Sequence, residues 1–164
     1  MVDIVIIDYG MGNIHSVYKS VLKVIDKKSK VRVSSSLVDI KNSTHLVLPG
    51  QGAFSTCMSG IKNTPGLADE LYEFAIIKKR PFLGICVGMQ MLANESEEKG
   101  QHKGLGWIEG RIKSIPNKNL KLPHMGWNTV KPIKNDSLIE TSDDYYFVHS
   151  YYFECRNKEN ILAE

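Results

Sequence analysis

The first half of the sequence alternates short apolar runs with segments of helical periodicity, and this alternation restricts the possible folds. The apolar runs are VDIVII (2–7), VRV (31–33), HLVLPG (45–50) and PFLGI (81–85). Between them, residues 14–25 place apolar side chains three and four apart, and residues 66–80 have a helical composition that ends in a basic turn. Strands that alternate with helices predict a parallel sheet covered by helices on both faces.

The second half of the sequence has a different character. Its β-branched and aromatic segments are GWIEGRIKSI (106–115), GWNTVKPI (126–133) and DYYFVHSYYFECR (144–156). These segments predict antiparallel strands added to the parallel sheet. A length of 164 residues, without an internal repeat or a linker, predicts one domain over residues 1–164.

The composition excludes several classes of protein. A net charge of +3 with scattered lysines argues against a nucleic-acid surface. No apolar stretch approaches the ~20 residues of a membrane span, and the N-terminus lacks a signal peptide pattern. Three cysteines without CxxC spacing argue against a zinc site or a disulfide framework. We therefore expect a reduced cytoplasmic protein that needs no metal or other cofactor and binds neither nucleic acid nor membranes.

The stretch PFLGICVGMQML (81–92) places Cys86 between a predicted strand and a predicted helix that begins near Val87 and runs through Leu92. Gly84 and Gly88 flank it in the pattern Gly-x-nucleophile-x-Gly, which is typical of a nucleophile elbow. Such a turn exposes the side chain, and the start of the helix favours the thiolate form. The backbone N–H of Val87 could then donate to an oxyanion.

A plainer interpretation is that each cysteine is a small buried core residue, and we apply it to Cys57 and Cys155. For Cys86 the two glycines and the strand-to-helix context favour the nucleophile. The segment LPGQGAF (48–54) could supply a second oxyanion donor, although, taken alone, a plain tight turn explains it better. The stretch DYGMGN (8–13) lacks the full dinucleotide fingerprint, so we do not assign a nucleotide site to it.

Six motifs occur in an order that resembles a known family. They are DYGMGNIHSV, LPGQGAF, GICVGMQML, GLGWIEGRI, LPHMGWN and YYFVHSYY. Together they resemble the class I (triad) glutamine amidotransferases, and within them the glutaminase subunit of imidazole glycerol phosphate synthase. The resemblance implies a flavodoxin-like α/β fold with a central, mostly parallel sheet. It also implies a glutaminase that passes ammonia to a (β/α)8 cyclase subunit in a heterodimer, for histidine biosynthesis.

The resemblance also implies roles for individual residues. Cys86 would attack the glutamine amide, and Val87 and Gln51 would form the oxyanion hole. The positions that match the glutamine pocket are Gly52, Gln90, Glu98, His149, Ser150 and Tyr151. The positions that match the face towards the cyclase are Asn13, Met125, Gly126, Trp127 and Asn128.

The sequence departs from the family pattern at two places. The family usually has Val at the position of Gln51, a change that affects a side chain and leaves the backbone N–H donor in place. The family also carries its base and its acid in a C-terminal His-Pro-Glu, and none of the five histidines here precedes Pro-Glu. On this comparison we expect the sequence to end before that motif, so that the domain is C-terminally incomplete.

Two other functions fit these observations. A related amidotransferase could supply ammonia to a nucleotide-sugar synthase or another synthase. A catalytically dead module that binds glutamine or a partner subunit would explain the absent His-Pro-Glu.

Overall fold

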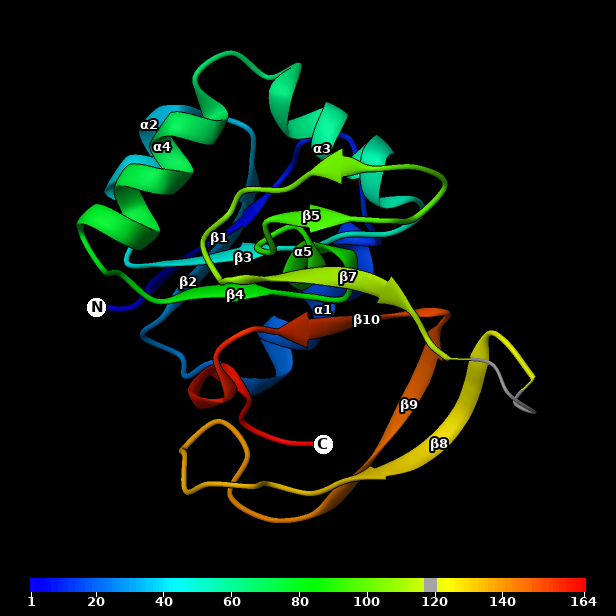
Figure 1. Cartoon of the computed structure of the whole chain (residues 1–164). Helices are drawn as coiled ribbons and strands as arrows, with labels where there is room; N and C mark the ends of the chain where they lie inside the picture. The colour runs from blue at the N-terminus through cyan, green and yellow to red at the C-terminus, as the bar shows by residue number, and fades with distance from the viewer. Residues whose placement is uncertain (117–120) are drawn as a thin grey trace. The chain divides into compact units, whose positions relative to one another are not determined.

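The structure is a computed structural model, and it describes residues 1–116 and 121–164 (Figure 1). Its contacts divide the described chain into two compact units, Met1–Leu92 and Ala93–Glu164. One domain over residues 1–164 stays a prediction.

The first unit contains the predicted alternation of strands and helices. Its elements are β1 (Asp3–Ile7), α1 (Ile14–Val24), β2 (Lys30–Ser34), α2 (Leu37–Asn42), β3 (His45–Leu48), α3 (Phe54–Lys62), α4 (Leu67–Tyr72), the π-helical turn η1 (Glu73–Ile77), β4 (Phe82–Gly84) and α5 (Val87–Gln90). The four strands are parallel in the order β2-β1-β3-β4. The predicted α/β fold with a mostly parallel sheet is therefore confirmed.

The strand order also determines where the helices lie. Going from β1 to β2 the chain moves one way along the sheet, and from β2 to β3 and on to β4 it moves the other way. Because such crossovers are right-handed, α1 covers one face and the helices that follow β2 and β3 cover the other, as Figure 1 shows for α1 against α2 and α4. The strand order thus reverses between β1 and β3, and the carboxyl ends of neighbouring strands at such a point form the usual ligand crevice.

The core of this unit is made by the central strands and the helices on one face. Residues Val5–Ile7 of β1 are completely buried, as a parallel strand with both faces covered requires. Phe54 and Ile61 of α3 and Phe74 of η1 are also fully buried.

Some helices differ from those that the sequence predicted. Helices α2 and α3 were not predicted. Helix α3 contains Ser and Thr, which favour turns over helix interiors, and α2 is only 6 residues long, too short to show a clear period. The predicted helix 66–80 is instead a short α-helix that continues as the π-helical turn η1. Helix α5 ends at Gln90 and does not continue through Leu92.

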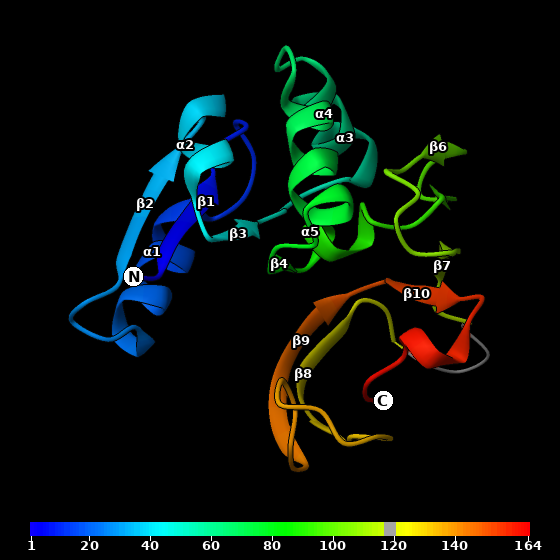
Figure 2. The same cartoon turned by 90° about the vertical axis from the view of Figure 1, so that its left-hand side faces the viewer.

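The second unit is built from strands. Its elements are β5 (Glu95–Ser96), β6 (His102–Lys103), β7 (Gly110–Ser114), β8 (His124–Val130), β9 (Asp143–His149), β10 (Tyr151–Cys155) and the 3₁₀ turn η2 (Lys158–Asn160). Strands β10, β7, β5 and β6 form one sheet in that order, and β8 pairs with β9 in an antiparallel hairpin (Figure 2). The aromatic segment 144–156 thus forms two strands in different sheets, which meet at Ser150.

Candidate active site

Cys86 lies on the turn between β4 and α5. Its backbone has φ 55° and ψ −118°, a region that L-residues other than glycine rarely adopt and that costs about 1–3 kcal/mol. The side chain is exposed, while the next two residues, Val87 and Gly88, are buried. Strain of this kind occurs at active sites because the surrounding structure holds one side chain in a useful place. The geometry is that of a nucleophile elbow.

Two flanking glycines allow the elbow to form. A Cβ on Gly84 would lie 2.6 Å from the Met89 Cα, and a Cβ on Gly88 would lie 2.0 Å from the Leu48 carbonyl oxygen. That oxygen also accepts a hydrogen bond from the Ile85 N–H at 3.0 Å, which fixes the end of β4 against the end of β3. The sequence pattern Gly-x-Cys-x-Gly therefore reflects a close approach of strand and helix backbones.

A third glycine brings the predicted oxyanion segment against the elbow. A Cβ on Gly50 would lie 2.3 Å from the Gly88 nitrogen and 2.9 Å from the Val87 Cβ. Gly50 follows β3, and Gln51 and Gly52 follow it as exposed residues. The segment Gly50–Gly52 thus lies directly beside the start of α5, at the carboxyl ends of two neighbouring strands.

The Val87 and Gln51 N–H groups stay the predicted oxyanion donors near Cys86. Val87 is the first residue of α5, and the first N–H groups of a helix have no acceptor within the helix. The Gln51 N–H belongs to the segment that Gly50 holds against α5. An exposed thiol beside such donors can carry out acyl transfer through a tetrahedral intermediate.

Buried side chains from two other elements contact the same loop. The Tyr9 hydroxyl donates to the Pro49 carbonyl oxygen at 2.6 Å, and the Cys57 thiol donates to the Gln51 carbonyl oxygen at 3.5 Å. Tyr9 is 6% exposed and Cys57 is completely buried. The sequence placed Cys57 in the core, which is correct, but gave no reason to connect it with the loop.

The first unit contains two more residues from the predicted sites. Gln90 ends α5 and is buried, one turn beyond Cys86. Asn13 is the N-cap of α1, where its Oδ1 accepts from the Ser16 N–H at 3.3 Å. Asn13 therefore has a structural role as a helix cap. Its contact with a partner stays a prediction.

The remaining predicted pocket residues belong to the second unit. Glu98 follows β5, and its N–H donates to the Ser96 Oγ at 3.2 Å. His149, Ser150 and Tyr151 form the junction of β9 and β10. Their place beside Cys86 stays a prediction.

His149 is part of a histidine pair on the hairpin. Its Nδ1 lies 2.9 Å from the Tyr151 carbonyl oxygen, and its Nε2 lies 3.1 Å from Nδ1 of His124. A carbonyl oxygen only accepts, so Nδ1 of His149 carries a proton; when the ring is neutral, its Nε2 accepts a hydrogen bond from Nδ1–H of His124. The His124 ring also stacks on Phe147, with ring centroids 4.9 Å apart. Both imidazoles are thus oriented by neighbours on the hairpin.

The pleat of the hairpin separates the residues of the predicted partner face. Met125 and Trp127 project from one face of β8, and Gly126 and Asn128 from the other. Opposite Met125 and Trp127 stand Val148 and Tyr146 of β9, which the sequence analysis did not single out. All four side chains are more than half exposed, and together they form an apolar face of the hairpin. Tyr145–Val148 form a continuous aromatic and apolar run, so no alternation within β9 marked out the last two.

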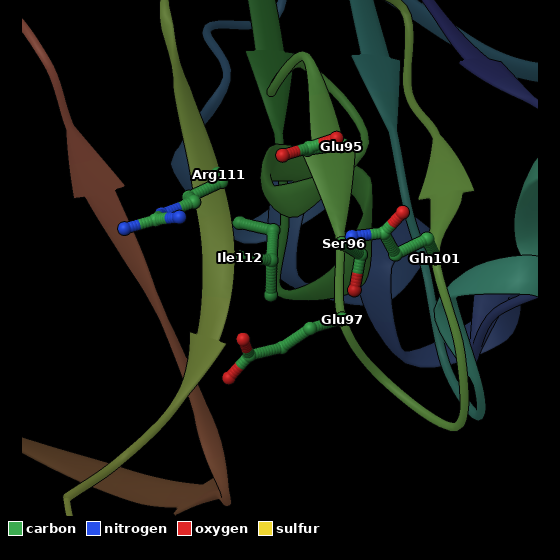
Figure 3. Close-up of a pocket in the computed structure, with 6 residues that line it drawn as sticks. All are labelled: Glu95, Ser96, Glu97, Gln101, Arg111 and Ile112. Atoms are coloured by element: carbon green, nitrogen blue, oxygen red, sulfur yellow. The ribbon is translucent and has the colours of Figure 1, made fainter.

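A small pocket of about 50 Å³ lies between β5 and β7 (Figure 3). It is lined by Glu95, Ser96, Glu97, Gln101, Arg111 and Ile112. Ligand pockets typically measure ~300–1,000 Å³, so this one has room only for water. Its charged groups are used in the structure, since Arg111 pairs with Glu154 at 2.8 Å and Glu97 accepts from the Ser114 N–H at 2.7 Å. We therefore assign no substrate to it.

Two further kinds of feature are absent from residues 1–116 and 121–164. No cluster of three or more His, Cys, Asp or Glu side chains is placed to hold a metal ion there. None of the helices in the same ranges has the length and apolar character to cross a lipid bilayer.

A comparison with protein families identifies the family to which this chain belongs. The family model described as "Glutamine amidotransferase class-I" matches residues 5–162. The chain belongs to this family. Membership agrees with the exposed Cys86 on its elbow and with the glycine-rich loop that lies beside it.

Several curated relatives of this amidotransferase carry one name. A protein of Pelagibacter ubique, "Imidazole glycerol phosphate synthase subunit HisH", is 42% identical over 98% of this chain and 80% of its own length. A protein of Methanococcus maripaludis, "Imidazole glycerol phosphate synthase subunit HisH 2", is 45% identical over 97% of this chain and 78% of its own length.

Solved structures support the fold of the amidotransferase at lower identity. One glutamine amidotransferase aligns with a TM-score of 0.74 over 98% of this chain and 79% of its own, at 16% identity. A putative GMP synthase protein from Thermoplasma acidophilum aligns with a TM-score of 0.64 over 99% of this chain and 72% of its own, also at 16% identity.

Proposed function

We propose that the chain is the glutaminase subunit of imidazole glycerol phosphate synthase and acts in histidine biosynthesis. The observation that carries the proposal is Cys86, an exposed thiol held at φ 55° on a strand-to-helix elbow. Family membership and the shared name of the relatives give the reaction and the pathway.

The proposed reaction proceeds through a thioester. The Cys86 sulfur attacks the side-chain carbonyl carbon of glutamine, and the C–S bond forms as the C–N bond breaks and ammonia leaves with an added proton. Water then attacks the thioester, which releases glutamate and restores the thiol. In both halves a negative charge develops on the carbonyl oxygen, where the N–H groups of Val87 and Gln51 would donate. Losing one such donor typically costs ~10²–10³-fold in rate.

Both halves of this reaction also need proton transfer by a positioned group. The sequence offers His15, His45, His102, His124 and His149. The hydrogen bonds of His124 and His149 orient them within the hairpin. We assign the role of base to none of the five.

We further propose that glutamine is held by Gly52, Gln90, Glu98, His149, Ser150 and Tyr151. Two features of the first unit support this assignment. Gly52 lies in the loop beside the elbow, where its φ of 96° is accessible to glycine. Gln90 is a buried polar residue on the helix that Cys86 caps.

The proposed partner is a (β/α)8 cyclase subunit, which would receive the ammonia and form imidazole glycerol phosphate and AICAR. The apolar face of Met125, Trp127, Tyr146 and Val148 supports a protein partner, because aromatic residues and methionine are enriched in interfaces. Trp127 is 72% exposed, and its ring meets Tyr146 edge-on at a centroid distance of 5.6 Å. A glutaminase that feeds another synthase would use the same chemistry, but the shared name of the relatives favours the histidine pathway. A dead binding module would not need the strained Cys86.

The glutamine site can be tested by protection of the thiol. We expect the chloroketone analogue of glutamine, in which –CH₂Cl replaces the amide nitrogen, to label Cys86 before Cys57 and Cys155. Glutamine at ten times its Kd should slow this labelling about tenfold, because it occupies the same site. Peptide mapping by mass spectrometry measures both results. Equal labelling of the three thiols, or equal protection by asparagine, would refute the proposal.

The partner face can be tested by truncating its largest side chain. We expect Trp127→Ala to weaken cyclase binding about 30-fold or more, since buried aromatic anchors contribute ~2 kcal/mol or more to an interface. Isothermal titration calorimetry gives the Kd. Leu138→Ala is the matched control, because Leu138 is 68% exposed and lies outside the hairpin face. The same Kd for both variants would place the cyclase elsewhere.

A further inference from the structure

Two buried side chains from different parts of the first unit hydrogen-bond to the loop Pro49–Gly52, which lies beside Cys86. Tyr9 follows β1, and its hydroxyl donates to the Pro49 carbonyl oxygen at 2.6 Å. Cys57 lies in α3, and its thiol donates to the Gln51 carbonyl oxygen at 3.5 Å. Hydrogen bonds in a buried site are stronger than in water because the local dielectric is low.

The two carbonyls belong to the peptides on either side of the Gly50–Gln51 peptide. All three peptides are trans, so the C=O and the N–H of each point in opposite directions. Holding the Pro49 carbonyl towards Tyr9 turns the Gly50 N–H away from it. Holding the Gln51 carbonyl towards Cys57 likewise turns the Gly52 N–H away from α3. The two peptides that flank the one with the Gln51 N–H are thus held in place, and they set the axis about which that peptide can turn.

Close packing keeps these anchors in place. A Cβ on Gly60 would lie 2.9 Å from the Tyr9 ring, so the glycine leaves room for the phenol. Gly60 and Cys57 stand three residues apart on α3 and share one face of the helix. On the other side of the loop, a Cβ on Gly12 would lie 3.0 Å from the Pro49 Cβ.

The Tyr9 hydroxyl stays protonated and can therefore always donate its hydrogen bond. Burial, and secondly the neighbouring Cys57, raises the pKa of the phenol above its ordinary value. The hydroxyl therefore keeps its proton at every pH at which the protein would work.

We propose that Tyr9 and Cys57 are positioning residues, which keep the Gln51 peptide within reach of the oxyanion by holding the two flanking carbonyls. This rests on the proposed function, since it assumes that Cys86 attacks a carbonyl carbon beside this loop. Neither side chain touches the substrate. Each acts through the backbone of the loop.

The test separates attack on a carbonyl from simple thiol reactivity. The glutamine chloroketone reacts in two stages: the thiolate adds to the ketone carbon and leaves an oxyanion, and the sulfur then shifts to the methylene carbon as chloride departs. Iodoacetamide alkylates by direct displacement of iodide and forms no oxyanion. Both rates are measured at Cys86, and the chloroketone data give a binding constant and a maximal rate of inactivation.

We expect Tyr9→Phe and Cys57→Ala each to lower the maximal chloroketone rate about tenfold. The chloroketone binding constant and the iodoacetamide rate should stay unchanged. Cys57→Ser, which keeps a donor, should recover most of the loss. Tyr72→Phe and Cys155→Ala are the controls, because Tyr72 is exposed and Cys155 lies on β10. Circular dichroism verifies folding, and if Tyr9→Phe does not fold, the two Cys57 variants decide the question.

The outcomes distinguish this inference from the proposed function. Unchanged chloroketone rates in the variants would overturn it. Parallel loss of the iodoacetamide rate would also overturn it, because the elbow itself would then be damaged. A wild-type chain without any preference for the chloroketone at Cys86 would instead refute the glutaminase assignment.

Discussion

Gly88→Ala is expected to lower the free energy of unfolding by about 3 kcal/mol or more, at the upper end of the cost of overpacking a core. The added Cβ would lie 2.0 Å from the Leu48 carbonyl oxygen, which is backbone and cannot move aside as a side chain could. That oxygen also accepts from the Ile85 N–H, so moving it breaks the pairing at the end of β4. Urea denaturation followed by circular dichroism measures the change, and the midpoint should fall by about 1 M or more.

Gly10→Ala is the matched control for this prediction. Gly10 has φ 82°, and a Cβ there would meet nothing within 4 Å. Its substitution should cost only the left-handed backbone penalty of about 1 kcal/mol. An equal loss of unfolding free energy in the two variants would show that the close packing of Gly88 against β3 does not contribute to stability.

Cys86→Ala is expected to abolish labelling by the glutamine chloroketone. The thiol is the attacking atom, and neither Cys57 in α3 nor Cys155 on β10 sits on an elbow. Mass spectrometry of the treated protein should show no adduct over a time that fully labels the wild type. An adduct that formed at the wild-type rate on another residue would contradict the assignment of Cys86.

Cys86→Gly adds a second readout from the same position. Glycine adopts φ 55° without a Cβ penalty, so this variant should be more stable than Cys86→Ala by about 1–2 kcal/mol while remaining unlabelled. A higher stability of Cys86→Gly than of Cys86→Ala would show that the backbone at the elbow is strained for any residue with a Cβ. Equal urea midpoints for the two variants would mean that the backbone there is relaxed.

The sequence was informative where one local pattern determines one local structure. In the run VDIVII, Val5–Ile7 are completely buried in β1, because a central parallel strand has no polar face. The two glycines around Cys86 predicted the elbow, since only residues without a side chain let a helix start so close to a strand. The helix at Ile14–Val24 followed from apolar spacing, with Asn13 as its cap.

Tertiary packing decided what local pattern could not. Helices α2 and α3 form in segments with weak helical propensity because neighbouring elements bury Ile40, Phe54 and Ile61. Similarly, the aromatic segment around Ser150 was read as one stretch, yet its two strands pair with different neighbours. Strand partners are long-range choices that depend on which edges and faces are available.

By itself, the sequence determined the parallel α/β fold and the nucleophile elbow, because alternating periodicity and paired glycines act over a few residues. Only the tertiary structure placed Gly50 against α5 and brought the Tyr9 hydroxyl and the Cys57 thiol to the carbonyls beside Gln51. Those contacts join residues about 40 positions apart in one case and six in the other. They depend on the order of the strands, which sets the ends of β1, β3 and β4 side by side, and no local pattern encodes that order.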